Sequence, residues 1–163
     1  MPPSDKYFAL HQWKETRGKF EQLLPLIDNQ KFIYPGWTLK DLLAHISGWD
    51  DAIIISLRAH SSKKINHFPS IQNLDEYNKL SVNYRKGLDY EQVLKEWRLT
   101  RLELITLIEQ LTEEEFSTPV SIPWGEKEHI TSLIDLFHDH EEHHMKDILL
   151  WLSHPDIPFK DGG

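Results

Sequence analysis

The densest group of residues able to bind a metal ion lies near the C-terminus, where four of the ten histidines fall between His138 and His144. Two of them, His140 and His144, continue an apolar series with the three- and four-residue spacing of one helix face. The other members of that series are Leu133, Phe137, Ile148 and Trp151. The two imidazoles should lie one turn apart on the buried face, where a pair at i and i+4 can bind one cation. His138 and His143 fall on other faces, and we expect them to be exposed or to contact the metal-binding histidines without binding the ion themselves.

A third imidazole is predicted by another stretch of helical spacing. His45 lies within an apolar series, where a polar ring without a partner would be costly. The series contains Leu42, Ile46, Trp49 and Ile53. Catalytic zinc centres usually take three protein ligands and leave a position open. Three inward-facing histidines, His45, His140 and His144, could therefore share one metal ion. The alternative, in which His45 is a core residue hydrogen-bonded to a neighbour, stays open at this point.

Residues near these histidines suggest supporting roles. Trp49 follows His45 by one helical turn and could form the wall of a pocket. Asp50 lies about 140° from His45 around the helix, which makes it a weaker ligand or base. Asp147 could hydrogen-bond an imidazole of the metal centre and fix its tautomer. The pair Glu141–Glu142 is expected on the solvated helix surface rather than in the chemistry.

The elements that must position these residues are helical, because alternating strand patterns are scarce and helical spacing recurs. Helices are predicted from about Asp5 to Asn29, from a cap at Thr38 to about His60, from Leu74 to Lys86, from Asp89 through Leu111, and from about Ile130 to Leu152. Connections rich in polar residues and proline separate them at 61–73 and 112–128. The pattern predicts an all-α four-helix bundle with a short extra helix in a long crossover.

Signals for helix ends support these boundaries. Thr38 with Asp41, and Asp89 with Gln92, have the spacing of capping boxes at helix N-termini. The ring of Pro25 removes one backbone hydrogen bond and should kink the first helix near its end.

The composition excludes several classes of protein. The 163 residues suit one domain, predicted over 1–163 with a core of about 5–152 and a tail at 153–163. A net charge of −8 argues against a nucleic-acid binder and against a basic membrane-surface helix. The absence of cysteine excludes disulfides, thiolate nucleophiles and cysteine-type zinc sites. Because there is no signal-peptide apolar region and no run of about 18 apolar residues, a cytoplasmic protein is expected.

Several of these residues also carry a family resemblance. The stretch PGWTLKDLLAHI at 35–46, followed by Gly48-Trp49-Asp50, resembles the second-helix signature of the DinB/YfiT-like superfamily. The HxxxH pair at 140–144 resembles its fourth-helix signature. Within the superfamily the sequence is most similar to the ClbS/DfsB family, through DEYN at 75–78 and HEEHHMKDI at 140–148. The resemblance covers about residues 5–152.

The resemblance implies a four-helix bundle with up-down-down-up topology, commonly a homodimer. It implies a divalent metal ion, zinc or nickel, bound by His45, His140 and His144. Members of the superfamily include thiol-dependent transferases, a maleylpyruvate isomerase and a metal-dependent hydrolase. The expectation is therefore a metal-dependent hydrolase or transferase that acts on a small molecule.

Two alternatives remain open at this stage. The ClbS/DfsB likeness implies a protective protein that binds or hydrolyses an electrophilic metabolite without metal, using Asp50, Trp49 and Tyr77. That branch usually has Glu just before the last histidine, where this chain has His143, and the complete three-histidine set favours metal. The other alternative is a non-catalytic, stress-related binding protein in which the histidines are structural.

Overall fold

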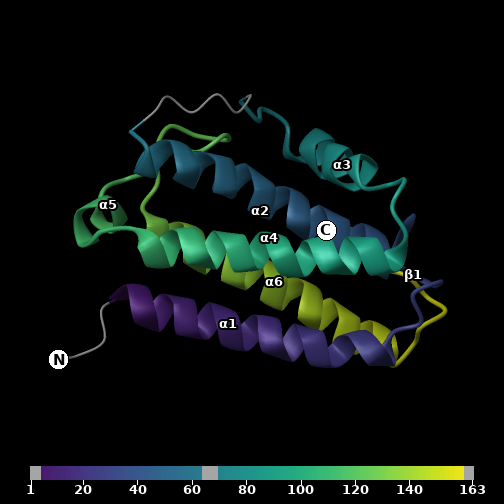
Figure 1. Cartoon of the computed structure of the whole chain (residues 1–163). Helices are drawn as coiled ribbons and strands as arrows, with labels where there is room; N and C mark the ends of the chain where they lie inside the picture. Colours follow the sequence, from purple (N-terminus) through teal and green to yellow (C-terminus); the bar gives the residue numbers. More distant parts are fainter. Residues whose placement is uncertain (1–4, 64–69, 160–163) are drawn as a thin grey trace.

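Four long helices form one bundle in the computed structural model, within the described residues 5–63 and 70–159 (Figure 1). They are α1 (Asp5–Leu23), α2 (Leu39–Ser61), α4 (Tyr90–Gln110) and α6 (Ile130–Leu152). In Figure 1, α1 and α6 run in one direction along the bundle and α2 and α4 run in the other. The order is therefore up-down-down-up, and the predicted fold class is confirmed. No helix of the described residues is long and apolar enough to cross a membrane.

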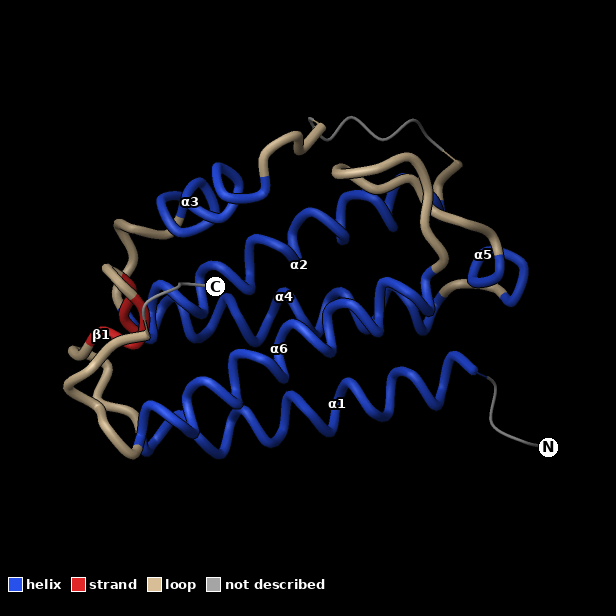
Figure 2. Tube along the Cα trace, turned by 180° about the vertical axis from the view of Figure 1, so that it is seen from behind, coloured by secondary structure: helices blue, strands red, loops and turns tan. Residues whose placement is uncertain are grey.

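A long crossover joins α2 to α4, because these consecutive long helices run in the same direction. It contains α3 (Leu74–Tyr84), which packs against α2 (Figure 2). The approach of the two helices depends on Gly48, since a Cβ built there would lie 2.4 Å from Cβ and Oγ of Ser81. The Tyr77 hydroxyl also donates a hydrogen bond to the Gly48 carbonyl oxygen, at 2.7 Å. The absence of a side chain at Gly48 thus allows α3 to pack closely against the middle of α2.

Both predicted capping boxes are present. At the start of α2, the Thr38 backbone N–H donates to the Asp41 carboxylate, at 2.9 Å. At the start of α4, the Asp89 carboxylate accepts from the Gln92 backbone N–H, at 2.8 Å, and the Gln92 side chain accepts in return. These contacts satisfy N–H groups that the first helical turn leaves without partners.

The first helix ends earlier than predicted. It stops at Leu23, and a 3-10 turn at Leu24–Leu26 follows, so the prediction of helix through Asn29 is wrong for its last residues. Pro25 lies within that turn, where its missing N–H and its ring favour a break in the α-helical hydrogen bonds.

Two small elements lie where the sequence predicts only turns and loops. Strands β1 (Phe32–Tyr34) and β2 (Trp37–Thr38) form an antiparallel hairpin whose turn includes Gly36 at a φ of 76°. The short helix α5 (Glu113–Ser117) lies in the connection between α4 and α6. Elements this short show no measurable periodicity. The hairpin nevertheless matters for the site, because it places Tyr34 and Trp37 against the histidines.

The core consists of two apolar clusters with a layer of charge between them. One cluster lies at the hairpin end of the bundle, and includes Ile33, Trp97 and Trp151. The other lies at the α5 end, and includes Trp13, Phe116 and Phe137. Buried between them is one charged residue from each long helix, namely Arg17, Asp50, Arg101 and Glu141.

Candidate metal centre

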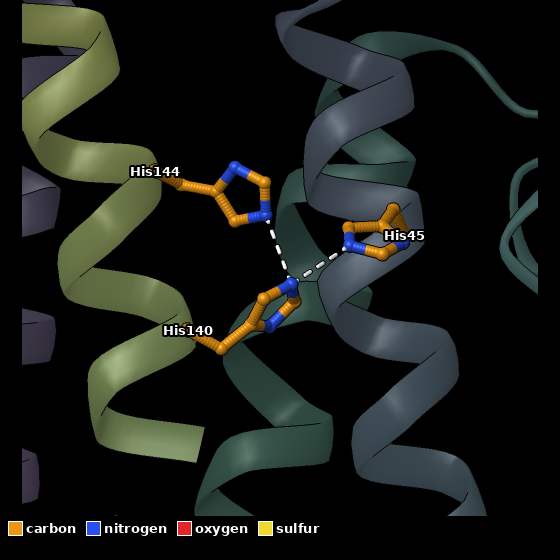
Figure 3. Close-up of side chains that lie close together, drawn as sticks. All are labelled: His45, His140 and His144. Atoms are coloured by element: carbon orange, nitrogen blue, oxygen red, sulfur yellow. Dashed lines mark hydrogen bonds between the residues drawn. The ribbon is translucent and has the colours of Figure 1, made fainter. Parts of the chain in front are cut away.

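The three histidines singled out by spacing come together between α2 and α6 (Figure 3). The Nε2 atom of His140 lies 3.1 Å from Nε2 of His45 and 3.0 Å from Nε2 of His144. His45 and His144 are fully buried and His140 is half-buried. Figure 3 shows the three rings converging on one point from two helices, although 95 residues separate His45 from His140.

This donor set fits a divalent cation better than it fits a hydrogen-bonded cluster. A neutral imidazole has one N–H donor and one acceptor nitrogen, so His140 Nε2 can donate its single proton to only one of its two neighbours at full strength. Tetrahedral zinc with bonds of about 2.0–2.1 Å separates its nitrogen ligands by about 3.3 Å. The two Nε2–Nε2 distances to His140 are therefore close to those of a metal ligand set, and one ring nitrogen from each of the three histidines lies within 4.8 Å of the others.

Burial keeps these imidazoles neutral. Loss of solvent, together with a smaller effect of the neighbouring His140, lowers the pKa of His45 to about 3. The pKa of His140 is lowered to about 4, mainly by loss of solvent, and the neighbouring Glu141 opposes part of this decrease. The pKa of His144 is also well below its ordinary value, because of burial and then of the neighbouring histidines. Near neutral pH all three rings therefore have a lone pair for a cation.

A tyrosine and a carboxylate orient the His144 ring through its Nδ1 atom, on the side away from the other histidines. The Tyr34 hydroxyl donates to Oδ2 of Asp147 at 2.6 Å and lies 2.8 Å from Nδ1 of His144. Because the tyrosine proton goes to the carboxylate, its oxygen accepts the Nδ1–H of His144, which leaves the Nε2 lone pair facing the other histidines. The sequence predicts a direct contact between Asp147 and an imidazole of the centre, whereas in the structure Asp147 reaches His144 through Tyr34. Sequence spacing gave no signal for Tyr34, which belongs to the hairpin.

The charged layer is next to the histidines, because its α6 member, Glu141, directly follows His140. Arg101 donates to Asp50 from Nε at 3.1 Å and from Nη2 at 3.0 Å, and to Glu141 from Nη1 at 2.6 Å. Arg17 donates from Nε to Glu141 at 2.5 Å and from Nη1 to the Trp97 carbonyl oxygen at 3.0 Å. Two positive and two negative groups are thus paired without net charge, and they connect all four long helices.

The sequence prediction for Glu141 is therefore wrong. The spacing predicts Glu141–Glu142 on the solvated surface, but the Glu141 side chain is completely buried and only Glu142 is partly exposed. Burial alone would raise the pKa of Glu141, but Arg101 and Arg17 outweigh it, and the pKa lies below its ordinary value. The carboxylate is ionised and fully engaged, so it is not a free base.

A cavity of about 240 Å³ adjoins the histidines. Its lining residues are His45, Trp49, Leu74, Asn78, Trp124, Leu136, Phe137 and His140. The Trp49 ring meets the Trp124 ring edge-on, with centroids 5.2 Å apart, and Trp49 Nε1 donates to Asn78 Oδ1 at 2.9 Å. Because His45 and His140 belong both to the cavity wall and to the histidine cluster, a molecule in the cavity would lie against two of the three candidate metal ligands.

The other two candidate residues lie outside this cavity wall. Asp50 is completely buried, and both of its carboxylate oxygens accept hydrogen bonds from Arg101. Tyr77 packs its ring edge-on against Trp49, and burial raises its pKa to about 12. Of the two histidines predicted to be exposed or supporting, the His143 side chain is 70% exposed and that of His138 is 26% exposed.

Comparison with known families identifies the superfamily. The family model of the DinB superfamily matches residues 11–148, which is most of the chain. The chain therefore belongs to the DinB superfamily. A search among curated protein sequences finds no significant match.

Solved structures share this fold at low sequence identity. One is a mycothiol-dependent maleylpyruvate isomerase, with a TM-score of 0.73 and 16% identity over 88% of this chain and 60% of that one. Another is YfiT from Bacillus subtilis, described as a probable metal-dependent hydrolase with an unusual four-helix bundle topology. It aligns with a TM-score of 0.69 and 19% identity over 95% of this chain and 89% of that one. The chain spans only three fifths of the isomerase, and at these identities the likeness shows the fold alone.

Proposed function

We propose that this member of the DinB superfamily binds a divalent metal ion through His45, His140 and His144 and catalyses hydrolysis or group transfer on a small molecule. The observation that carries the proposal is the convergence of three neutral imidazoles, with Nε2 contacts of 3.0 and 3.1 Å, at the wall of a cavity. The descriptions of two structural neighbours, a metal-dependent hydrolase and a thiol-dependent isomerase, support the reaction class.

Some residues of the chain would bind the metal ion, and others orient the ligand rings or line the cavity. A bound divalent ion would supply Lewis acidity at the histidine end of the cavity. Tyr34 and Asp147 hold the tautomer and the direction of the His144 ring. Trp49 and Trp124 line the space beside the ligands with aromatic ring surface. No carboxylate lines this cavity among the described residues, so the chain contributes metal binding and substrate orientation rather than a carboxylate base.

The identity of the metal follows from the donor chemistry. Imidazole nitrogen suits zinc and nickel, whereas magnesium and calcium prefer oxygen ligands. We therefore propose zinc or nickel, with at least one coordination position left for substrate or solvent.

We retain the ClbS/DfsB likeness as the finer family proposal, and we favour the metal-dependent reading over its metal-free one. A metal-free protective hydrolase would need Asp50 as a base or nucleophile, and Arg101 occupies both of its oxygens. The DEYN element of that likeness falls on α3 and places Asn78 in the cavity wall. A non-catalytic binding protein would leave the converging Nε2 atoms unexplained.

For partners, we propose a small-molecule substrate and a cytoplasmic homodimer that binds neither nucleic acid nor membrane. The net charge of −8 supports the exclusion of nucleic acid. Exposed leucines on α4 and α6 support a dimer, for example Leu102 and Leu149. Light scattering after size exclusion would show a mass of twice 19.3 kDa, and a single-chain mass would contradict this proposal.

The test of the activity compares two histidines on the same helix. Zinc- and nickel-loaded protein is assayed on a panel of esters, amides and thiol acceptors, with and without a chelator. We expect turnover to be lost on chelation and in His140→Gln, and retained in the control His138→Gln. Turnover that survives both chelation and His140→Gln would contradict a metal-dependent reaction at this centre.

A further inference from the structure

We infer that the substrate of this centre has an aromatic or aliphatic body without charge, and that any charge it carries is confined to the group that meets the metal ion. The inference rests on the proposed function and narrows its substrate class. It comes from the lining of the 240 Å³ cavity beside His45 and His140.

The cavity has the size and the surface for one ring. Apart from the two histidines and Asn78, its walls are aromatic and aliphatic side chains, including Trp124, Phe137 and Leu136. A cavity of about 150 Å³ is sufficient to bind benzene. The volume here therefore accommodates a substituted ring or two fused rings, packed against the edges and faces of the tryptophans.

The lining of the cavity disfavours a second charge on the part of the ligand that is buried in it. Within residues 5–63 and 70–159, the part of the chain that the structure describes, no Lys, Arg, Asp or Glu lines the cavity. Asp50 and Glu141, which directly follow the cavity residues Trp49 and His140 in the chain, are already paired with Arg101 and Arg17. A carboxylate or phosphate on the ligand body would lose its water without gaining a partner, which is strongly unfavourable. Only a group in contact with the metal ion would have its charge balanced.

One polar contact is available to the ligand body. Trp49 Nε1 can only donate, so its hydrogen bond of 2.9 Å fixes Oδ1 of Asn78 as the acceptor. The amide NH₂ of Asn78 is then left as a donor in the cavity wall. It suits a neutral oxygen, such as a carbonyl, ether or hydroxyl group, on the body of the ligand.

Three hydroxamic acids with the same metal-binding head test the inference. Zinc-loaded protein is titrated by calorimetry with acetohydroxamic acid, benzohydroxamic acid and 4-carboxybenzohydroxamic acid. We expect benzohydroxamic acid to bind at least about tenfold more tightly than acetohydroxamic acid, because the ring is buried. We expect the 4-carboxy compound to lose most of that gain.

A charge added at the cavity rim should reverse the discrimination. Leu136 lines the cavity and is 51% exposed, so Leu136→Arg can be introduced without disturbing the core. We expect it to tighten binding of the 4-carboxy compound several-fold, by supplying the missing partner. The control is Leu150→Arg, at a position on the same helix that is 65% exposed and outside the cavity, which should change nothing.

The possible failures are distinguishable. If none of the three compounds binds because the protein holds no zinc, the proposed function fails and the inference fails with it. If all three bind equally, the metal centre stands but the inference about the substrate body is overturned. A 4-carboxy compound that binds the unmodified protein as tightly as benzohydroxamic acid also overturns it.

Discussion

Replacing Glu141 by glutamine removes one of two negative charges from the buried layer while nearly keeping the shape of the side chain. Glu141 accepts from Arg17 Nε at 2.5 Å, from Arg17 Nη2 at 3.4 Å and from Arg101 Nη1 at 2.6 Å. After Glu141→Gln, two guanidinium groups would face Asp50 alone, and the buried layer would carry a net positive charge.

The expected loss of stability follows from that charge. Breaking a buried ion pair by removing one partner costs about 3–5 kcal/mol, because the remaining charge stays desolvated. For a chain of this size each kcal/mol lowers the melting temperature by about 2–4 °C, so a decrease of about 6–20 °C is expected. The sign also fixes the pH dependence of this contribution. Because folding lowers the pKa of Glu141, its stabilising contribution is present above about pH 4.3 and is lost as the pH falls below that value.

The assay is urea unfolding followed by circular dichroism, with the adjacent residue as the control. Glu142 is partly exposed and pairs with Lys146 at 3.3 Å, a contact worth about 0–1 kcal/mol. Glu142→Gln should therefore change the free energy of unfolding by less than about 1 kcal/mol. Adding Arg17→Met to Glu141→Gln restores the charge balance and should recover much of the lost stability. If Glu141→Gln alone lies within about 1 kcal/mol of the unmodified protein, the buried charges do not stabilise the bundle as described.

Three further predictions concern the metal centre and α3. Tyr34→Phe should raise the dissociation constant for zinc by about 10–100-fold with the fold intact, because it removes the contact that orients His144; an unchanged constant in a competition titration with a chromophoric chelator would refute this role. Gly48→Ala should destabilise the protein by about 1–3 kcal/mol in urea unfolding, because its Cβ collides with Ser81, whereas Gly18→Ala, with open space around it, should be neutral or stabilising. In the metal-free folded protein the pKa values of the three buried imidazoles are lowered, so below about pH 6.5 the unfolded chain binds more protons than the folded one. As the pH decreases below that value, the free energy of unfolding should therefore decrease by up to about 1.4 kcal/mol per pH unit for each ring. A flat profile of urea midpoints between pH 6.5 and pH 5 would contradict the burial of neutral imidazoles.

The features that could be predicted from sequence are those that repeat over long helices. The apolar spacing around His140 and His144 put both on one buried face, and the series around His45 did the same for α2. The Thr38 and Asp89 capping boxes located two helix starts to within a residue. Each of these signals lies within one helix, where local geometry dictates which side chains share a face.

The features that were missed depend on partners from other parts of the chain. Glu141 is buried because Arg17 and Arg101, from two other helices, neutralise it, and charge alone suggested a solvated surface. A signal did exist, since Arg17 itself lies between Trp13 and Phe20 at helical spacing, where a surface residue is not expected. Tyr34 belongs to a three-residue strand, too short for any pattern, and it reaches His144 only through tertiary packing.

The central claim is tested most directly by counting metal ions in protein purified without a histidine tag. After incubation with zinc or nickel and desalting, inductively coupled plasma mass spectrometry should find about one divalent ion per chain. The exposed control His143→Asn should keep that ion, whereas His45→Asn and His144→Asn should each lose most of it. A folded, unmodified protein that retains less than about a tenth of an ion per chain would contradict the metal centre described here.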